Sequence, residues 1–273
     1  MPELPEIFVI ANQMNDVLHG KTVAGVEIRQ PKNLNIPADK FEGAVVGKTF
    51  GRVEPCGKWI FAELEPGYRL LINLGMGGDL IYFESEEDLP ENYQFKLSLD
   101  DGTGFTARFY WFGYIHLVES ARPEDHRMTR DLGPSPVADD FTLERFLALA
   151  EKKRRSGVKS FITNQKNIAG IGNVYAQDIL FVPKLHPLRK VETLSDDERV
   201  ALYDAIRKVL GESIDLGGLK YEKDFLGVSG QYSGEHMLVA YKEGEPCPEC
   251  DTAIEKIKTG TTASYICPKC QKE

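Results

Sequence analysis

Four of the five cysteines lie close together near the end of the chain, as two CxxC pairs separated by sixteen residues. The pairs are formed by Cys247, Cys250, Cys267 and Cys270. Two CxxC turns can present four thiolates to one Zn²⁺ ion in a tetrahedral site. Two disulfides or a redox pair are the alternatives, but a chain without a secretion signal is expected in a reducing compartment. The spacing therefore predicts one structural zinc ion, because four thiolates leave no open position.

A second group of residues able to do chemistry lies at the start of the chain, which reads MPELPE. If Met1 is removed, Pro2 presents a free secondary amine. An α-amino group has a pKa of about 7.7–8.0, so an appreciable fraction is neutral and nucleophilic near pH 7. The alternative is a disordered N-terminus without a chemical role.

The segment NIAGIGNVYAQDILF places two glycines just before a predicted helix. Glycine permits close backbone approach, the N–H groups at a helix start point outward, and Asn173 can add a side-chain donor. The surrounding residues 145–190 contain ten basic and two acidic side chains. Together these features predict a phosphate-binding surface. Tight helix packing for the glycines and a solvated helix face for the cations are the alternatives.

The chain as a whole is acidic, with 33 Lys and Arg against 42 Asp and Glu among its 273 residues, a net charge of −9. Taken alone, that balance argues against a nucleic-acid partner. A hydrophobic fraction of 42% and a charged fraction of 27% exclude a disordered or fibrous chain. There is no apolar run long enough for a transmembrane helix and no secretory signal, so we expect a cytoplasmic protein without a membrane partner.

At least two kinds of secondary structure must position these groups. Residues 6–19 have apolar side chains at helical spacing, and about a hundred residues of short alternating runs follow. These runs predict an antiparallel β-sandwich or barrel. The linker LGPSP comes next, and the spacing then turns helical, with a capping box from Ser195 to Glu198. The glycine-rich residues 217–234 predict a long mobile loop.

Taken together, these features resemble the formamidopyrimidine-DNA glycosylase/endonuclease VIII family, and formamidopyrimidine-DNA glycosylase more closely. The resemblance covers nearly the whole chain and rests on MPELPE, GKWIF, LGM, LGPSP, AGIGNVYA and CPEC…CPKC, in that order. It implies an α+β multidomain fold. A β-sandwich with an N-terminal helix would span residues 1–132, a helical domain with a helix–two-turns–helix element residues 136–232, and a zinc-ribbon hairpin residues 238–273.

The resemblance also implies a reaction. Pro2 would attack C1′ of a damaged nucleotide, expel the base and leave an iminium, and β- and δ-elimination would then cleave the strand. Glu3 would move protons during opening of the sugar ring, with Glu6 as a second carboxylate of the site. Lys58 would complete the catalytic group and contact a phosphate. We predict Lys58 on a strand, where a solvated surface lysine is the alternative.

The DNA contacts implied by the resemblance come from several parts of the chain. Met76 and Phe112 match side chains that fill the gap left by an everted base, although both also fit core positions. Lys159 and Asn173 match phosphate contacts. The implied partner is double-stranded DNA that contains a damaged base or an abasic site, and the implied state is a monomer in a bacterial cytoplasm, associated with the nucleoid when bound to DNA.

Two segments depart from the family pattern. Tyr110 and Trp111 stand where the family has arginines, and an aromatic ring can stack in DNA but lacks the bidentate donors of arginine. On the predicted hairpin, Thr262 stands where the family presents an arginine to phosphates, and Lys256 and Lys258 are the nearby cations. We therefore count Tyr110 and Lys258 among the expected DNA-binding residues.

Three functions compete on this basis. The first is a bifunctional DNA glycosylase/AP lyase of base-excision repair that excises oxidised bases, with Met76 favouring purines. The second is a catalytically impaired family member that binds damaged or abasic DNA without efficient turnover, which the residues at 110 and 262 favour. The third is a zinc-ribbon RNA-binding module of other descent.

Overall fold

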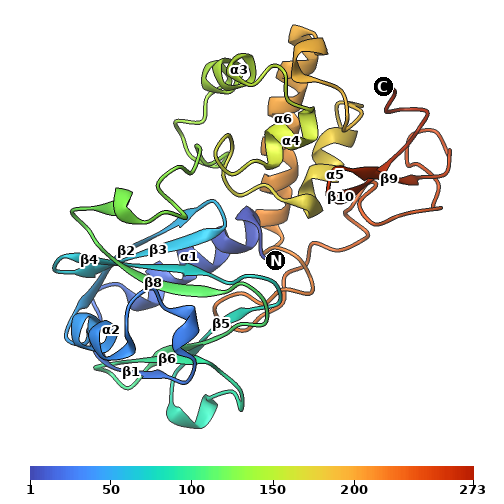
Figure 1. Ribbon diagram of the computed structural model, residues 1–273. Coiled ribbons are helices and arrows are strands. Elements are labelled where there is room, and N and C mark those ends of the chain that lie inside the picture. The colour runs from blue at the N-terminus through green and yellow to red at the C-terminus, as the bar shows by residue number, and fades with distance from the viewer. The chain divides into compact units, whose positions relative to one another are not determined.

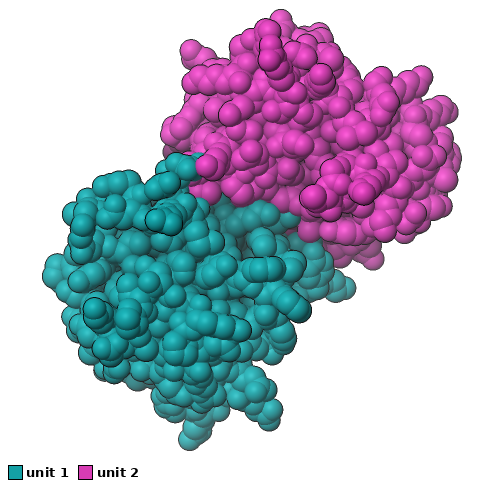
Figure 2. Space-filling model, in the orientation of Figure 1, with its two compact units in different colours: residues 1–131, 217–231 teal, residues 132–216, 232–273 magenta.

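The computed structural model describes residues 1–273 and divides into two compact units, which Figure 2 distinguishes by colour. Unit 1 comprises residues 1–131 and 217–231, and unit 2 comprises residues 132–216 and 232–273. Residues 217–231 therefore group with the N-terminal unit, whereas the predicted helical domain of residues 136–232 included them. The predicted domain limits otherwise stay predictions.

Unit 1 contains two four-stranded antiparallel sheets and confirms the expected β-sandwich. One sheet has the order β1-β6-β7-β5, formed by Val23–Ile28, Phe95–Leu99, Gly104–Arg108 and Asp79–Phe83. The other has the order β2-β3-β4-β8, formed by Thr49–Cys56, Trp59–Glu65, Tyr68–Asn73 and Tyr114–Glu119. Every other residue of β6 is buried, namely Phe95, Leu97 and Leu99, which is the pattern of a strand with one face in the core.

The N-terminal helix α1 spans Leu4–Leu18 and packs against β2 (Figure 1). Its buried face includes Ile7, Ile10 and Met14, at the helical spacing seen in the sequence. The short helix α2, Ala38–Val45, was not predicted; it buries Phe41 and Val45. Three single-turn 3₁₀ helices complete unit 1 at Pro31–Asn33, Glu86–Asp88 and Pro123–Asp125.

Residues 217–231 contain no helix or strand, as expected from their glycine content, and they contact unit 1 at defined points. Phe225 is fully buried in the core of the unit, and its backbone N–H donates to Gln13 Oε1 at 2.9 Å. Gln13 Nε2 in turn donates to Asp224 Oδ2 at 2.8 Å. The side chains of Phe225 and Gln13 therefore hold the centre of the segment. The glycine content of the segment indicates neither contact.

Unit 2 is helical, with a β-hairpin at its C-terminal end, as expected. Its elements are α3 (Leu143–Lys152), α4 (Val158–Thr163), α5 (Asn173–Phe181), a 3₁₀ turn (Val191–Thr193), α6 (Asp196–Asp215), β9 (Glu255–Thr259) and β10 (Thr262–Ile266). Figure 1 shows α6 as the longest helix of this unit. The predicted capping box is present, because Ser195 and Glu198 bond to each other's backbone N–H. No helix of the protein is both long and apolar enough to cross a bilayer.

The hairpin is joined to the helices by buried polar and apolar contacts. Asp178 of α5 accepts hydrogen bonds from the backbone N–H groups of residues 238, 239 and 240 at 2.9–3.1 Å. Gln271 donates to Leu185 O at 2.9 Å, and Phe181 packs with Tyr265 in one apolar cluster. These contacts join the C-terminal residues to α5 and the turn after it, independently of a bound metal ion.

Candidate active site and nucleic-acid interface

The start of α1 gathers the predicted N-terminal residues in buried positions. Pro2 is buried, and Glu3 is the N-cap residue with 3% of its surface exposed. Glu6 Oε2 accepts the backbone N–H of Glu3 at 2.8 Å, and its Oε1 accepts the N–H of Leu219 at 3.1 Å. Glu6, predicted as a second site carboxylate, thus joins the start of α1 to residues 217–231. Both of its oxygens accept backbone N–H groups in this arrangement.

Lys58 lies beside the carboxylate of Glu3. Its Nζ is 3.7 Å from Glu3 Oε1, and the two side chains are 16% and 4% exposed. The structure places Lys58 in a two-residue turn between β2 and β3 rather than on the predicted strand, because Cys56 already pairs with Trp59. Gly57 has a φ of 61°, which suits the first position of such a turn. The turn projects the lysine from the sheet edge toward α1.

A carboxyl group that sequence reasoning missed lies at the same place. Glu222 Oε1 is 3.6 Å from the amino nitrogen of Met1. Burial raises the pKa of Glu222 above its usual value, and the charged N-terminus opposes that rise. Nothing in the sequence pattern indicated this residue, because its partner is 221 positions away along the chain and the contact depends on how residues 217–231 fold.

The predicted gap-filling residues are exposed on two adjacent loops of unit 1. Met76 is 43% exposed, Tyr110 60%, Trp111 64% and Phe112 64%. The backbone N–H of Met76 donates to Trp111 O at 2.8 Å, which joins the two loops. Neither Met76 nor Phe112 belongs to the core, so the alternative considered for them is excluded.

The glycine motif of unit 2 lies at the start of α5, as predicted. Gly172 is the N-cap residue and Asn173 the first residue of the helix. Gln177, one turn later, donates to Asn173 O at 2.9 Å and to Asn173 Oδ1 at 3.2 Å. Its own Oε1 accepts the N–H of Tyr265 at 3.1 Å. The asparagine is therefore held in register with strand β10 by one glutamine.

Lys159, predicted as a phosphate contact, is enclosed by the hairpin. Only 6% of its surface is exposed. Its Nζ donates to four oxygens, which are Thr259 Oγ1 at 3.0 Å, Thr262 Oγ1 at 3.1 Å, Ala263 O at 2.8 Å and Ser264 Oγ at 2.8 Å. Burial lowers the pKa of Lys159 to about 8. The ammonium group thus holds α4 to the hairpin, and a direct phosphate contact stays a prediction.

The two faces of the hairpin differ in character. Thr262 pairs with Thr259 and Ser264 with Ile257, so the oxygens around Lys159 lie on one face. Lys258 pairs with Ala263 and is exposed on the other face. The predicted DNA contact of Lys258 would therefore use the face opposite to Lys159.

The four predicted cysteines converge at the end of the hairpin. Their sulfur atoms all lie within 4.8 Å of one another. Individual Sγ–Sγ distances are 3.9 Å for Cys247 and Cys270, 3.5 Å for Cys250 and Cys267, and 3.5 Å for Cys250 and Cys270. A tetrahedral Zn–S₄ site with bonds of about 2.3 Å needs sulfurs about 3.8 Å apart. The cluster fits one structural zinc ion, as predicted.

The basic window of unit 2 is partly neutralised. Acidic side chains pair with five of its ten cations, namely Arg145, Arg154, Lys184, Arg189 and Lys190. Three exposed cations follow or end α3, which are Lys152, Lys153 and Arg155. The effective positive charge of the window is thus smaller than its composition indicates.

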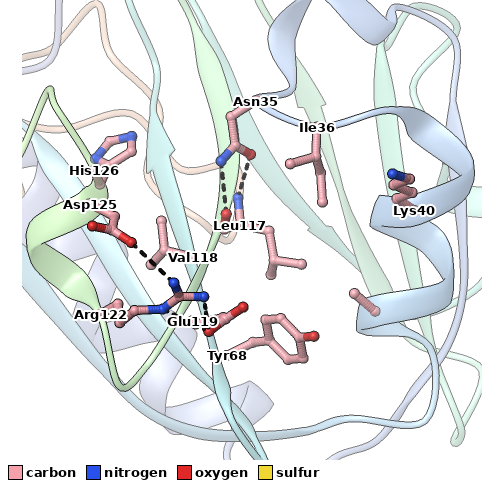
Figure 3. A pocket seen from close by; sticks show the side chains of 11 residues that line it. Asn35, Ile36, Lys40, Tyr68, Leu117, Val118, Glu119, Arg122, Asp125 and His126 are labelled. Atoms are coloured by element: carbon pink, nitrogen blue, oxygen red, sulfur yellow. Dashed lines mark hydrogen bonds and ion pairs between the residues drawn. The ribbon is translucent and has the colours of Figure 1, made fainter.

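A pocket of about 360 Å³ in unit 1 is lined by none of the predicted site residues (Figure 3). Four of its polar side chains are already paired, since Arg122 pairs with Glu119 and Asp125, and Asn35 bonds to the backbone of Leu117 in both directions. We therefore place the candidate site at the start of α1 and not in this pocket.

Comparison with known proteins matches three family models along the chain. Residues 1–110 match the formamidopyrimidine-DNA glycosylase N-terminal domain, and residues 132–223 match the formamidopyrimidine-DNA glycosylase H2TH domain. Residues 244–272 match the zinc finger found in FPG and IleRS.

Whole-chain relatives agree with these matches. The formamidopyrimidine-DNA glycosylase of Chloroflexus aggregans is 36% identical, over 99% of this chain and 98% of that protein, and that of Streptococcus mutans is 31% identical over the full length of both. The Lactococcus lactis Fpg structures with abasic-site DNA and with FAPY-dG DNA each give a TM-score of 0.88 at 26% identity, covering 99% of this chain and 100% of that one. The chain therefore belongs to the formamidopyrimidine-DNA glycosylase family.

Proposed function

We propose that this protein is a bifunctional DNA glycosylase and AP lyase of base-excision repair. The observation that carries the proposal is the group at the start of α1, where Pro2, the Glu3 carboxylate and the Lys58 ammonium come together. Its family membership supports the enzyme class. The abasic and FAPY-dG DNA in the related structures supports DNA with an abasic site or an oxidised purine as the substrate.

The proposed reaction begins after removal of Met1. The nitrogen of Pro2 forms a bond to C1′ as the bond from C1′ to the base breaks, and the base leaves with a proton. The sugar ring opens when O4′ receives a proton, for which Glu3 is the donor, and a C1′ iminium results. Loss of a proton from C2′ expels the 3′ phosphate, and a second elimination expels the 5′ phosphate. Water then releases the sugar fragment from Pro2.

Lys58 has two roles in this proposal. Its ammonium group, 3.7 Å from the carboxylate, orients Glu3 while the ring opens. It also provides a charge-assisted donor to a phosphate beside the lesion, because 16% of its side chain remains exposed. Unit 2 would contribute Asn173 at the start of α5 and the exposed cations after α3 as further phosphate contacts.

Borohydride trapping on abasic-site duplex DNA tests the proposal. Reduction of the iminium should give a covalent protein–DNA adduct, and mass spectrometry should place it on Pro2 of a chain that lacks Met1. The Pro2→Gly variant should lose the adduct and retain DNA binding, since the phosphate contacts are elsewhere. Lack of any adduct with the wild-type protein, with binding intact, would exclude the enzymatic proposal.

The same experiment addresses the impaired alternative. The specific observation in its favour is Thr262, an exposed residue whose neutral hydroxyl accepts from Lys159, where the family presents an arginine. Under that alternative, the Thr262→Arg variant should show adduct formation that the wild type lacks. Equal adduct yields for the two proteins would instead mean that the reaction does not depend on a cation at this position.

A further inference from the structure

Three carboxyl groups of unit 1 lie near the start of the chain, and they differ in the groups that they contact. Both oxygens of Glu6 accept backbone N–H groups, from Glu3 and Leu219. The carboxylate of Glu3 lies 3.7 Å from the ammonium of Lys58. The third carboxyl belongs to Glu222, whose Oε1 lies 3.6 Å from the N-terminal amine. The reaction proposed above uses Glu3 and leaves Glu222 without a role.

The backbone on both sides of Glu222 is fixed by hydrogen bonds. Its N–H donates to Leu219 O at 3.0 Å, and its carbonyl accepts the N–H of Gly230 at 3.3 Å. Three residues later, Phe225 is fully buried, and its carbonyl accepts the N–H of Tyr82 in β5 at 2.8 Å. Only 10% of the Glu222 side chain is exposed. The folded backbone of this segment therefore keeps the carboxyl close to the N-terminus.

Burial and two neighbouring charges set the ionisation of Glu222. Burial raises its pKa, the N-terminal ammonium opposes the rise, and the carboxylate of Asp79 in β5 adds to it. Asp79 is itself paired with Arg108, and Glu3 is paired with Lys58, so each of these two pairs is neutral in sum. A buried carboxyl beside an amine can take up the proton of that amine, because burial favours the uncharged forms of both groups.

Removal of Met1 makes Pro2 the residue that carries the terminal amine. Consecutive Cα atoms are about 3.8 Å apart, so the new terminus lies one residue from the amine that Glu222 contacts. The Glu222 side chain can follow this shift by a change of rotamer. Pro2 is buried, so few water molecules can accept the proton of its ammonium group. Glu222 is therefore placed to accept it.

We propose that Glu222 accepts a proton from the Pro2 ammonium and returns it to the oxygen that leaves C1′ of an abasic site. This inference rests on the proposed function, and it adds a second proton-transfer residue to Glu3.

The protons balance in this step. Once the sugar ring is open, the carboxylate of Glu222 takes one proton from the ammonium, which leaves a neutral amine and a carboxylic acid. The amine nitrogen forms a bond to the aldehyde carbon C1′, and its remaining proton moves to the aldehyde oxygen. Glu222 then protonates the resulting hydroxyl, the bond from C1′ to oxygen breaks, and water leaves. The iminium forms beside the restored carboxylate, which balances its charge.

Single-turnover trapping with cyanoborohydride on abasic duplex DNA, at pH 6 and at pH 8.5, tests this role. In the Glu222→Gln variant, the ammonium must lose its proton to water, so only the fraction of Pro2 that is already neutral reacts. That fraction is small at pH 6 and large at pH 8.5, because a free α-amino group has a pKa of about 7.7–8.0. We expect the adduct to form about 100-fold more slowly than in the wild type at pH 6, and within about threefold of it at pH 8.5.

Two variants serve as controls. Glu222→Asp keeps a carboxyl group and should recover part of the rate at pH 6. Glu91→Gln removes an exposed carboxyl of unit 1 outside residues 217–231 and should match the wild type at both pH values. An equal loss at both pH values in Glu222→Gln, or no loss at either, would overturn the proposal, because a merely structural role does not depend on pH in this way.

A titration without DNA gives a second reading. In protein labelled with ¹³C-proline, the Cδ shift of the N-terminal proline reports the pKa of its amine. Glu222→Gln removes a negative charge beside the ammonium and should lower that pKa by about 0.5 or more. An unchanged pKa would mean that the carboxyl does not face Pro2, and would overturn the proposal. Because the titration needs no reaction, failure of this role is distinct from failure of the proposed function, which would appear as a wild type without any adduct.

Discussion

The two units surround their basic side chains with different kinds of groups. In unit 2, the ammonium of Lys159 is enclosed by four neutral oxygens at 2.8–3.1 Å. In unit 1, His116 Nδ1 and His126 Nε2 bond to each other at 2.8 Å among aromatic rings, while Lys58 lies against the carboxylate of Glu3. A cage of neutral oxygens keeps a cation in place without an acid, whereas burial among rings lowers the pKa of both imidazoles and so favours their uncharged form.

This difference indicates that Lys159 has a structural role and that Lys58 has a role in the proposed reaction. All the ammonium protons of Lys159 are used in hydrogen bonds that hold α4 to the hairpin. The charge therefore serves mainly to keep unit 2 folded. Lys58 makes one contact with a carboxylate and keeps an exposed side, so its charge is available to a substrate.

Loss of zinc should have the largest effect and should be confined to unit 2. Cys267→Ser removes a thiolate from a site whose binding free energy is about 10–16 kcal/mol in small zinc domains. We expect the hairpin to lose order, the Lys159 cage to open, and DNA affinity to fall about 100-fold. Zinc content and melting curves measure this, with a transition of unit 1 retained.

Cys56→Ser is the matched control, because Cys56 lies in β2 of unit 1 and outside the cluster. It should leave one zinc ion per chain. A purified wild-type protein with zinc content near zero would contradict the assignment.

Substitution of Lys58 should reduce the rate of strand cleavage much more than it reduces DNA affinity, because only one phosphate contact is lost with the charge. Lys58→Met keeps the length of the side chain but removes the charge beside Glu3, and a loss of about 10²–10⁴-fold is typical when a proton-transfer group is disturbed. Single-turnover cleavage of abasic DNA measures it. Lys48→Met, which removes a partly exposed lysine bonded to Pro66 O, is the control and should cleave normally. A Lys58→Met protein with unchanged cleavage rate but weakened binding would remove the distinction between the two lysines.

Much of the fold was predictable because it depends on local patterns. The spacing of Ile7, Ile10 and Met14 gave α1, and Ser195 with Glu198 gave the start of α6. The helix α2 was missed because its buried face has only Phe41 and Val45 over eight residues. The contacts of residues 217–231 could not be predicted, because the packing of Phe225 into unit 1 depends on a contact with Gln13, far away in sequence.

The candidate site was predictable only where a motif carried it. The four cysteines and the positions of Pro2 and Glu3 followed from spacing and resemblance. The partners of those residues did not, because hydrogen bonds between distant segments leave no periodic signal. Glu222 beside the N-terminus, the amide of Asn73 behind Lys58, and the cage around Lys159 are all contacts of this kind.

The imidazole pair should make unit 1 sensitive to acid. Burial and, secondarily, the neighbouring His126 lower the pKa of His116 to about 4 from 6.5, and burial lowers that of His126. The unfolded chain therefore binds more protons than the folded one between pH 6.5 and 4, so stability is fully present above pH 6.5 and falls as the pH drops. We expect a loss of about 2 kcal/mol at pH 4, after allowance for solvent screening.

Denaturant unfolding at a series of pH values, followed by tryptophan emission, measures this loss. His116→Gln has no titrating ring at this position and should flatten the profile. An unaltered profile in that variant would assign the acid sensitivity to other groups.

The smallest expected effect belongs to Lys159, and it distinguishes a structural cation from a phosphate ligand. Its pKa in the folded protein, about 8, lies below its usual 10.5. Between these values the unfolded chain binds more protons, so the free energy of unfolding should rise with pH across this window, by about 1 kcal/mol after screening. The same loss of a proton removes a positive charge, so DNA affinity should fall severalfold as the pH rises through 8.

Lys159→Met should abolish both trends at little cost in stability. Thr259 Oγ1 and Ser264 Oγ remain 2.8 Å apart and can satisfy each other, so an apolar side chain of similar length leaves few unpaired groups. Lys256→Met, on the opposite face of the same hairpin, should keep both trends. If Lys159→Met instead reduced DNA affinity about 100-fold at pH 7 with the hairpin intact, the lysine would leave its cage to bind phosphate, and the two lysines would share one role.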